Sequence, residues 1–284
     1  MLTPFNADLS IDWDALDAYT DWLIEQGAAG LFPVALSGEM YNLSENERLA
    51  IAARVVDHAA GRVPVIASVV ETGSADVHAA AAARLAATGV DAVILIASMI
   101  LEEHEDESGL AAKIQHIVDA NPGVDFGIYE CPLPYHRILS TDAVAAMAQT
   151  GRFVFFKETS HDVALMAERV LVSEGTPMKV YNAGIETLVD SLRVGVSGLS
   201  GWVVNVYPAA VAELCANGAT MDYDAAIAAQ DSLDRVERGM GPTYPNSAKF
   251  LLAQRGLDFA PVSRWNSKPI ASEDLTALAT AFAS

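Results

Sequence analysis

Short apolar runs that alternate with helical stretches constrain the fold of this chain most strongly. Each run is almost continuously apolar and is bounded by Gly, Pro, Asp or Ser, as expected of strands buried on both faces. Strand–helix units repeated in this way predict a parallel sheet. The runs cover residues 30–36, 63–69, 92–97, 125–130, 153–157, 179–182 and 196–200, and residues 2–5 supply the end of an eighth.

Eight such units close into a (β/α)8 TIM barrel, which takes about 250 residues, and the chain has 284. The alternative is an open, doubly wound sheet, which normally carries G-x-G-x-x-G after its first strand. That motif is absent here, so the sequence favours an α/β fold of the barrel type. The expected domains are a catalytic barrel (1–218) and a C-terminal helical extension packed on it (219–284), with helices at 209–217, 222–237, 246–255 and 273–283.

Helix boundaries are marked by polar residues that can cap the first turn. Ser44 followed by Glu47 forms a capping-box pattern ahead of apolar positions at helical spacing. Ser74 and Ser160 are predicted N-caps of two further helices.

The charge balance excludes several classes of partner. With 37 acidic and 17 basic residues the net charge is −20, which disfavours binding to nucleic acid or anionic lipid. No apolar run reaches the 18–20 or so residues of a membrane helix, and the first residues lack the pattern of a signal peptide. We therefore expect a soluble, cytoplasmic protein whose acidic excess is a solvated surface or an adaptation to salt.

The cysteines and histidines give no metal signal. Cys131 and Cys215 are too few for a disulfide framework, and we interpret them as ordinary thiols. The six histidines show no paired ligand spacing. The acidic run at 102–107 is interpreted as a solvated loop, with cation binding as the alternative. His161 follows a strand end and is interpreted as a surface residue at a helix entry, with lining of the site as the alternative.

Polar residues at predicted strand ends are the candidates for chemistry, because barrel active sites lie there. Lys157 follows four apolar residues, and burial favours its neutral, nucleophilic amine, which can form a Schiff base with a carbonyl. Tyr129 ends the preceding run and can relay protons. The structural alternatives are a lysine paired with Glu158 and a core tyrosine. Ser37 and Gly38 offer a hydroxyl and exposed N–H groups for a carboxylate, or form an ordinary turn.

Taken together, these positions resemble the N-acetylneuraminate lyase / dihydrodipicolinate synthase family of class I, Schiff-base aldolases. The most specific part is a strand-end tyrosine, Tyr129, with Pro132 three residues on and Lys157 following 28 residues later. The resemblance extends over nearly the whole chain. It covers Thr3-Pro4-Phe5, residues 35–39 with Leu43-Ser44-x-x-Glu47-Arg48, residues 64–67, 89–92, 128–132, 156–159 and 245–256.

The resemblance implies a mechanism without metal or cofactor. Lys157 would form an imine with a 2-oxo acid such as pyruvate, and Tyr129 would act as general acid and base. Ser37 and the backbone of Leu36 and Gly38 would bind the carboxylate. Backbone near Ser200 would line the pocket, and Thr159 and Glu186 match positions that contact substrate hydroxyls in sugar-acid-cleaving members. The family also implies a homo-oligomer, a tetramer or a dimer.

Departures from the family pattern argue against the dihydrodipicolinate synthase reaction itself. Leu36 replaces a relay hydroxyl, and the relay tyrosine of the neighbouring subunit falls near Met99 and Ile100. The arginine that grips the second substrate falls at Pro134, three residues from Arg137. Glu130, where the family often has asparagine, points to a different second substrate. Tyr135, His136 and Arg137 either line its site or pack a loop.

Three hypotheses follow. The first is a lyase that cleaves a 2-keto-3-deoxy sugar acid, or a similar 2-oxo acid, to pyruvate and an aldehyde. The second is a dehydratase of a deoxy-keto-sugar acid on the same scaffold. The third is a homologue that binds a 2-oxo acid without turnover, which the loss of the relay groups at Leu36 and Ile100 suggests.

Overall fold

Five parallel strands form one sheet in a computed structural model that describes residues 1–268 and 270. The strands pair in chain order and are β1 (Ile66–Ser68), β2 (Ala92–Ile96), β3 (Phe126–Tyr129), β4 (Phe153–Glu158) and β5 (Lys179–Asn182). Their register places Ile96 beside Tyr129 and Tyr129 beside Lys157. The carboxyl ends of three neighbouring strands therefore meet at one edge of the sheet.

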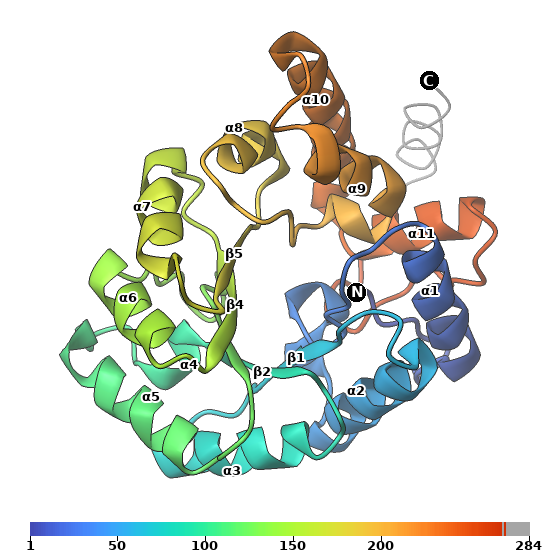
Figure 1. The fold of residues 1–284 in the computed structure, drawn as a ribbon. Coiled ribbons are helices and arrows are strands. Elements are labelled where there is room, and N and C mark those ends of the chain that lie inside the picture. The colour runs from blue at the N-terminus through green and yellow to red at the C-terminus, as the bar shows by residue number, and fades with distance from the viewer. Residues whose placement is uncertain (269, 271–284) are drawn as a thin grey trace.

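Helices form a ring around these strands, which is the barrel arrangement that the sequence predicts (Figure 1). A helix precedes or follows each strand and covers the outer face of the sheet. The ring consists of α1 (Trp13–Glu25), α2 (Glu45–Ala59), α3 (Ala75–Ala86), α5 (Leu110–Asp119), α6 (Thr141–Gln149), α7 (Val163–Ser173) and α8 (Leu188–Arg193), and the short α4 (Ala97–Ile100) follows β2 directly.

Three of the eight predicted strands are reduced to single bridges, and the strand predicted at 63–69 is shortened to β1. In 30–36 only Leu31 pairs, with Val65, because Pro33 has no N–H to donate and the chain then turns into a 3-10 helix at Leu36–Gly38. In 196–200 Leu199 pairs with Asn182, in a segment interrupted by Gly195, Gly198 and Gly201. In 2–5 Phe5 forms an antiparallel bridge with Ile11.

The predicted helix caps are confirmed in part. Ser44 accepts from the N–H of Glu47, and the Glu47 carboxylate accepts from the N–H of Ser44, so the capping box is present. Ser74 precedes α3 but makes no capping hydrogen bond. Ser160 is wrong as an N-cap, because Asp162 caps α7 by accepting from two N–H groups of its first turn.

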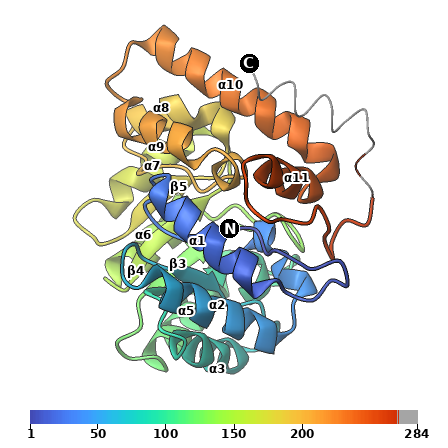
Figure 2. The same ribbon diagram turned by 90° about the vertical axis from the view of Figure 1, so that its right-hand side faces the viewer.

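Three helices follow the barrel strands along the chain and pack beside the barrel (Figure 2). They are α9 (Pro208–Asn217), α10 (Tyr223–Met240) and α11 (Asn246–Gln254). A cluster of buried apolar side chains joins α8, α9 and α10, among them Leu188, Leu214 and Leu233. The helix predicted at 273–283 lies outside the described residues, and the domain boundary at 218 stays a prediction.

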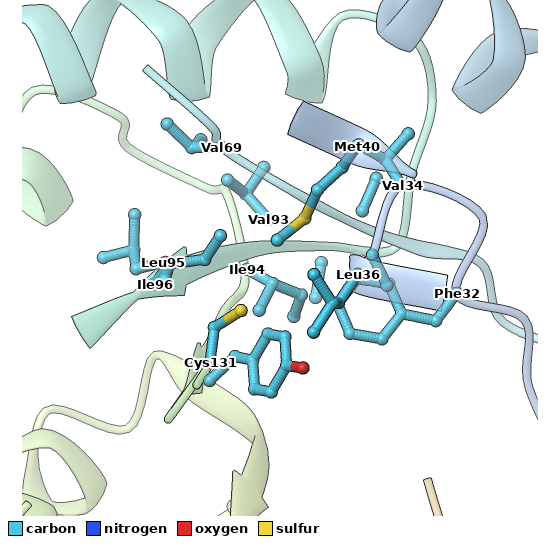
Figure 3. Packing of buried hydrophobic residues seen from close by; sticks show 14 of the residues in the cluster. Phe32, Val34, Leu36, Met40, Val69, Val93, Ile94, Leu95, Ile96 and Cys131 are labelled. Carbon is cyan, nitrogen blue, oxygen red and sulfur yellow. The ribbon is translucent and has the colours of Figure 1, made fainter. Parts of the chain in front are cut away.

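Buried apolar side chains pack on both faces of β2, and Figure 3 shows Val93, Ile94, Leu95 and Ile96 among their neighbours, because successive residues of a strand point to opposite faces. All five residues of β2 are buried, as expected for a central parallel strand. Within residues 1–268 and 270, no helix combines the length and hydropathy needed to span a membrane.

Candidate active site

Lys157 and Tyr129 lie together at the carboxyl edge of the sheet. The Lys157 side chain comes from β4, is 8% exposed, and places its Nζ 4.7 Å from the centre of the Tyr129 ring. Burial lowers the pKa of Lys157 to about 8 and raises that of Tyr129, which is 2% exposed. The lysine therefore has a substantial neutral fraction near neutral pH, the form that attacks carbonyls.

Ser37 and Ser200 line one cavity with Lys157. Its volume is about 90 Å³, and Phe32 and Asn205 lie on its wall. Ser37 belongs to the 3-10 turn Leu36–Gly38, whose tightness requires glycine: a Cβ on Gly38 would lie 2.3 Å from the carbonyl oxygen of Pro33. The structure thus brings three of the predicted site residues together, while Leu36 is buried in the apolar core.

Thr159 is buried two residues beyond Lys157, and its hydroxyl is already engaged. Its Oγ1 donates to the carbonyl oxygen of Glu130 at 2.8 Å and lies 2.7 Å from Nε2 of His136. His136 is an exposed residue, and the partial desolvation of its ring lowers its pKa. The hydroxyl of Thr159 therefore fixes His136 beside the end of β4.

A fully buried arginine holds the ends of β3 and β4. Arg169 on α7 donates to both carboxylates that follow the catalytic candidates: it lies 2.9 Å from Glu130 and forms an ion pair with Glu158. Glu130 also accepts from the N–H groups of Leu139 and Thr159, at 2.8 and 3.0 Å. Glu130 is thus committed to this buried network, and its bearing on the choice of second substrate stays a prediction.

Glu186 lies on the rim, paired with a residue that was interpreted as a surface histidine. His161 Nδ1 is 2.5 Å from Glu186 Oε1, and this hydrogen bond raises the pKa of His161 and lowers that of Glu186. His161 has a left-handed backbone, with φ of 60°. Gly184 leaves room for the pair, since a Cβ there would lie 2.4 Å from His161 Nδ1.

Glu237 is an electrostatic neighbour of Lys157 that sequence reasoning missed. It comes from α10 in the helical extension and accepts from the N–H of Val203 at 2.8 Å. Burial, with the neighbouring Glu186 carboxylate, raises its pKa to about 7, and Lys157 lowers it. A charged residue in an amphipathic helix gives no sequence signal for this placement, because it depends on how α10 packs over the barrel.

Two further tyrosines and a cysteine were also missed. The hydroxyl of Tyr41 lies 3.7 Å from Sγ of Cys131, which is 0% exposed. The Tyr244 hydroxyl accepts from Asn205 at 3.0 Å and lies beside Ser37. Cys131 is two residues beyond Tyr129, and that spacing is the one sequence signal that pointed here.

The loop after β3 is held by its own side chains. Arg137 donates to the carbonyl oxygens of Glu102 and Glu105, both at 2.8 Å, and Tyr135 donates to that of Leu101. Of the two roles left open, loop packing therefore applies to Tyr135 and Arg137. No group of three or more His, Cys, Asp or Glu side chains suited to a metal ion occurs among residues 1–268 and 270.

A barrel that carries a buried lysine at a strand end, with a tyrosine against it, has the architecture of the class I, Schiff-base-forming aldolases and lyases, and the chain is an enzyme of this class. More narrowly, it belongs to the dihydrodipicolinate synthetase family, whose sequence profile matches residues 1–283.

Relatives and solved structures agree with this assignment. The chain is 28% identical to 4-hydroxy-tetrahydrodipicolinate synthase of Pseudomonas aeruginosa, over 90% of this chain and 87% of that protein. It is 30% identical to an uncharacterized DapA-like lyase of Halobacterium salinarum, over 92% of this chain and 84% of that protein. The crystal structure of a dihydrodipicolinate synthase from Bacillus anthracis superposes with a TM-score of 0.88 at 24% identity, covering 100% of this chain and 96% of that one. The crystal structure of the dihydrodipicolinate synthase from Acinetobacter baumannii, solved with pyruvate, superposes with a TM-score of 0.85 at 23% identity, covering 100% of this chain and 96% of that one.

Proposed function

We propose that the protein is a lyase in which Lys157 forms a Schiff base with a 2-oxo acid. The iminium then accepts the electrons of the C3–C4 bond, so that a 2-keto-3-deoxy sugar acid or a similar compound is cleaved to pyruvate and an aldehyde. Tyr129 moves the proton of the C4 hydroxyl. The observation that carries this proposal is the buried lysine, whose pKa is about 8, with Nζ 4.7 Å from the Tyr129 ring.

The cavity beside Lys157 supports binding of a 2-oxo acid. Ser37 and Ser200 share this cavity with the amine, and backbone N–H groups of the turn at Leu36–Gly38 suit a small carboxylate. Two solved relatives, from Acinetobacter baumannii and Escherichia coli, are complexes with pyruvate. A carboxylate held here presents its keto carbon to Lys157.

The rim supports a hydroxylated second part of the substrate over a carboxylated one. Glu186 and Glu237 bring two carboxyl groups to this side, and hydroxyl groups can donate to both. The position expected to hold a carboxylate-binding arginine is Pro134, and Arg137 is engaged with backbone carbonyls. A second carboxylate would therefore meet repulsion where a polyol meets acceptors.

Borohydride trapping tests the covalent step. The protein is incubated with pyruvate, reduced with borohydride and analysed by peptide mass spectrometry. We expect one adduct, on Lys157, and none in Lys157→Met. The matched control is Lys179→Met, at the exposed start of β5, which should retain the adduct. No adduct on Lys157 with pyruvate or other 2-oxo acids would refute the proposal.

A dehydratase is the second candidate, and Glu237 is the observation that favours it. With a pKa of about 7, its carboxyl group is partly protonated at neutral pH and can donate to a leaving C4 hydroxyl. The products separate the two functions. A panel of 2-keto-3-deoxy acids should release pyruvate if the enzyme is a lyase, and yield a new 2-oxo acid without pyruvate if it is a dehydratase.

A further inference from the structure

The proposed function leaves a problem of proton transfer. Tyr129 must pass a proton on after each turnover, yet it is 2% exposed and its hydroxyl has a raised pKa. Leu36, at a position where the family carries a relay hydroxyl, is buried and apolar. Ile100, at the other expected relay position, is also buried. The route between Tyr129 and solvent must therefore use other groups.

Cys131 and Tyr41 are arranged to provide that route. The thiol of Cys131 interacts with the hydroxyl of Tyr129 and is an electrostatic neighbour of Lys157. The hydroxyl of Tyr41 lies 3.7 Å from the same sulfur, which is a hydrogen-bonding distance for a thiol. Cys131 itself is fully buried among apolar side chains that include Leu36 and Ile94 (Figure 3), whereas Tyr41 is half-exposed.

The position of Tyr41 is fixed from outside the barrel. It follows Glu39, whose left-handed backbone (φ of 62°) begins the 3-10 turn Met40–Asn42. The Glu39 carboxylate is fully buried and bonds Lys249 at 2.7 Å and the N–H of Arg264 at 2.7 Å. The Tyr41 hydroxyl also lies 2.7 Å from the carbonyl oxygen of Leu133. Rotation about its C–O bond moves its proton between that oxygen and the thiol.

We propose that Tyr129, Cys131 and Tyr41 form a proton relay within one chain, with Cys131 and Tyr41 as positioning residues that act through Tyr129. This inference rests on the proposed function. In cleavage, the C4 hydroxyl proton passes to Tyr129, the Tyr129 proton to the thiol, the thiol proton to Tyr41 and the Tyr41 proton to water. The C3–C4 electron pair moves into the iminium to give an enamine, and C4 becomes a carbonyl. Each relay group ends with the protons it began with.

Two substitutions of Cys131 separate a relay from a packing role. Cys131→Val keeps the apolar packing and removes the exchangeable proton, whereas Cys131→Ser keeps the proton and places a hydroxyl in apolar surroundings. A relay predicts that kcat falls at least about tenfold in Cys131→Val, with KM changed less, and returns to within about threefold in Cys131→Ser. A packing role predicts the opposite order, because valine is the better substitute in an apolar site.

Tyr41→Phe should lower kcat as Cys131→Val does, and the two losses should not add, because both break one path. Two matched controls remove a thiol and a tyrosine hydroxyl elsewhere. They are Cys215→Ala on α9 and Tyr223→Phe on α10, where the Tyr223 hydroxyl donates to Asp190 at 3.1 Å. Both should keep the kcat of the parent protein. Melting temperatures of all variants identify any that fail to fold.

End-point trapping with pyruvate and borohydride keeps this test distinct from that of the proposed function. A relay changes rates but not the imine equilibrium, so Cys131→Val and Tyr41→Phe should give as much Lys157 adduct as the parent. If the parent forms no adduct, the proposed function fails. If the parent forms it and Cys131→Val or Tyr41→Phe retains the full kcat, or serine and valine lose the same activity, the relay is overturned.

Discussion

Lys157 must lose a proton before its amine attacks a carbonyl, so the rate of imine formation follows its pKa. Since burial lowers that pKa to about 8, the neutral fraction should rise about tenfold per pH unit below 8 and level off above it. Rapid mixing with pyruvate at each pH, quenched with borohydride at one fixed pH, measures the rate. If Lys157 had an ordinary pKa, the rate of imine formation would keep rising to pH 10. Such a rise, or a rate that does not depend on pH, would contradict the assignment.

Substitution of Gly184 should impair recognition of the hydroxylated part of the substrate and leave imine formation by the 2-oxo acid part unchanged. Alanine fits its backbone, with φ of −102°, but its Cβ would lie 2.4 Å from His161 Nδ1 and 2.7 Å from Glu186 Oε1. We expect Gly184→Ala to lower kcat/KM for a hydroxylated 2-oxo acid about tenfold, as for one misplaced hydrogen-bonded contact, and to leave the pyruvate adduct intact. Gly109→Ala is the control, because no heavy atom would contact its new Cβ. Equal kcat/KM values in both variants would rule out a role of the rim pair.

Site residues at the ends of apolar strands could be predicted from the sequence, whereas those on turns and on the helical extension could not. Lys157 and Tyr129 end apolar strands, so their place at the mouth follows from the strand pattern alone. Tyr41 is placed by the 3-10 turn Met40–Asn42, and Glu237 by the packing of α10 on the barrel. Neither placement leaves a periodic pattern in the sequence from which it could be predicted. His161 is exposed, as predicted for a surface residue, but its ion pair with Glu186 joins two separate loops and has no sequence signal.

At the level of elements, α7 is tied to two strands by one side chain. Arg169 is fully buried between Glu130 after β3 and Glu158 at the end of β4. Arg169→Met should reduce the free energy of unfolding by about 3–5 kcal/mol, because it leaves two carboxylates buried and unpaired. Urea denaturation followed by circular dichroism measures the loss.

Arg54→Met is the control for this loss. Its guanidinium pairs with Asp17 at the protein surface, where such a pair contributes about 1 kcal/mol or less. If the two variants had equal stability, the buried network would not anchor α7. The sequence pattern predicted α7 and both strands but not this arginine, because a charged residue within a helix is ordinarily expected on its solvated face.

For the whole molecule, the net charge of −20 extends over the surface, whereas the amine of Lys157 acts only locally. A small anionic substrate gains nothing from the overall field, so under the proposed function its capture would depend on local donors such as those near Ser37 and on a covalent bond to Lys157. The order of strands and helices was predictable because burial on both faces imposes continuous apolar runs. The predicted strands at 30–36 and 196–200 are reduced to single bridges, since Pro33 and Gly198 interrupt the ladder, and residues 2–5 form only the antiparallel bridge of Phe5 with Ile11.

We propose that the barrel and the helical extension unfold as one unit, and the pair between Glu39 and Lys249 on α11 tests this. Both side chains are fully buried, with Lys249 Nζ 2.7 Å from Glu39 Oε1. Lys249→Met leaves the Glu39 carboxylate without its cation, at an expected cost of about 3–5 kcal/mol. In a chain of this size that corresponds to a fall in Tm of about 5–8 °C.

One cooperative unit requires that this fall appear in a single transition. Far-ultraviolet circular dichroism reports on all helices, and tryptophan fluorescence includes Trp265 of the extension and Trp202, which stacks on Tyr244 of the extension. The two signals should shift together in Lys249→Met. Lys113→Met removes a half-exposed pair with Glu105 and should change stability by about 1 kcal/mol or less. Two separate transitions, of which only one shifts in Lys249→Met, would mean that the extension unfolds on its own, and Tyr41 would then lose the anchor that holds it against Cys131.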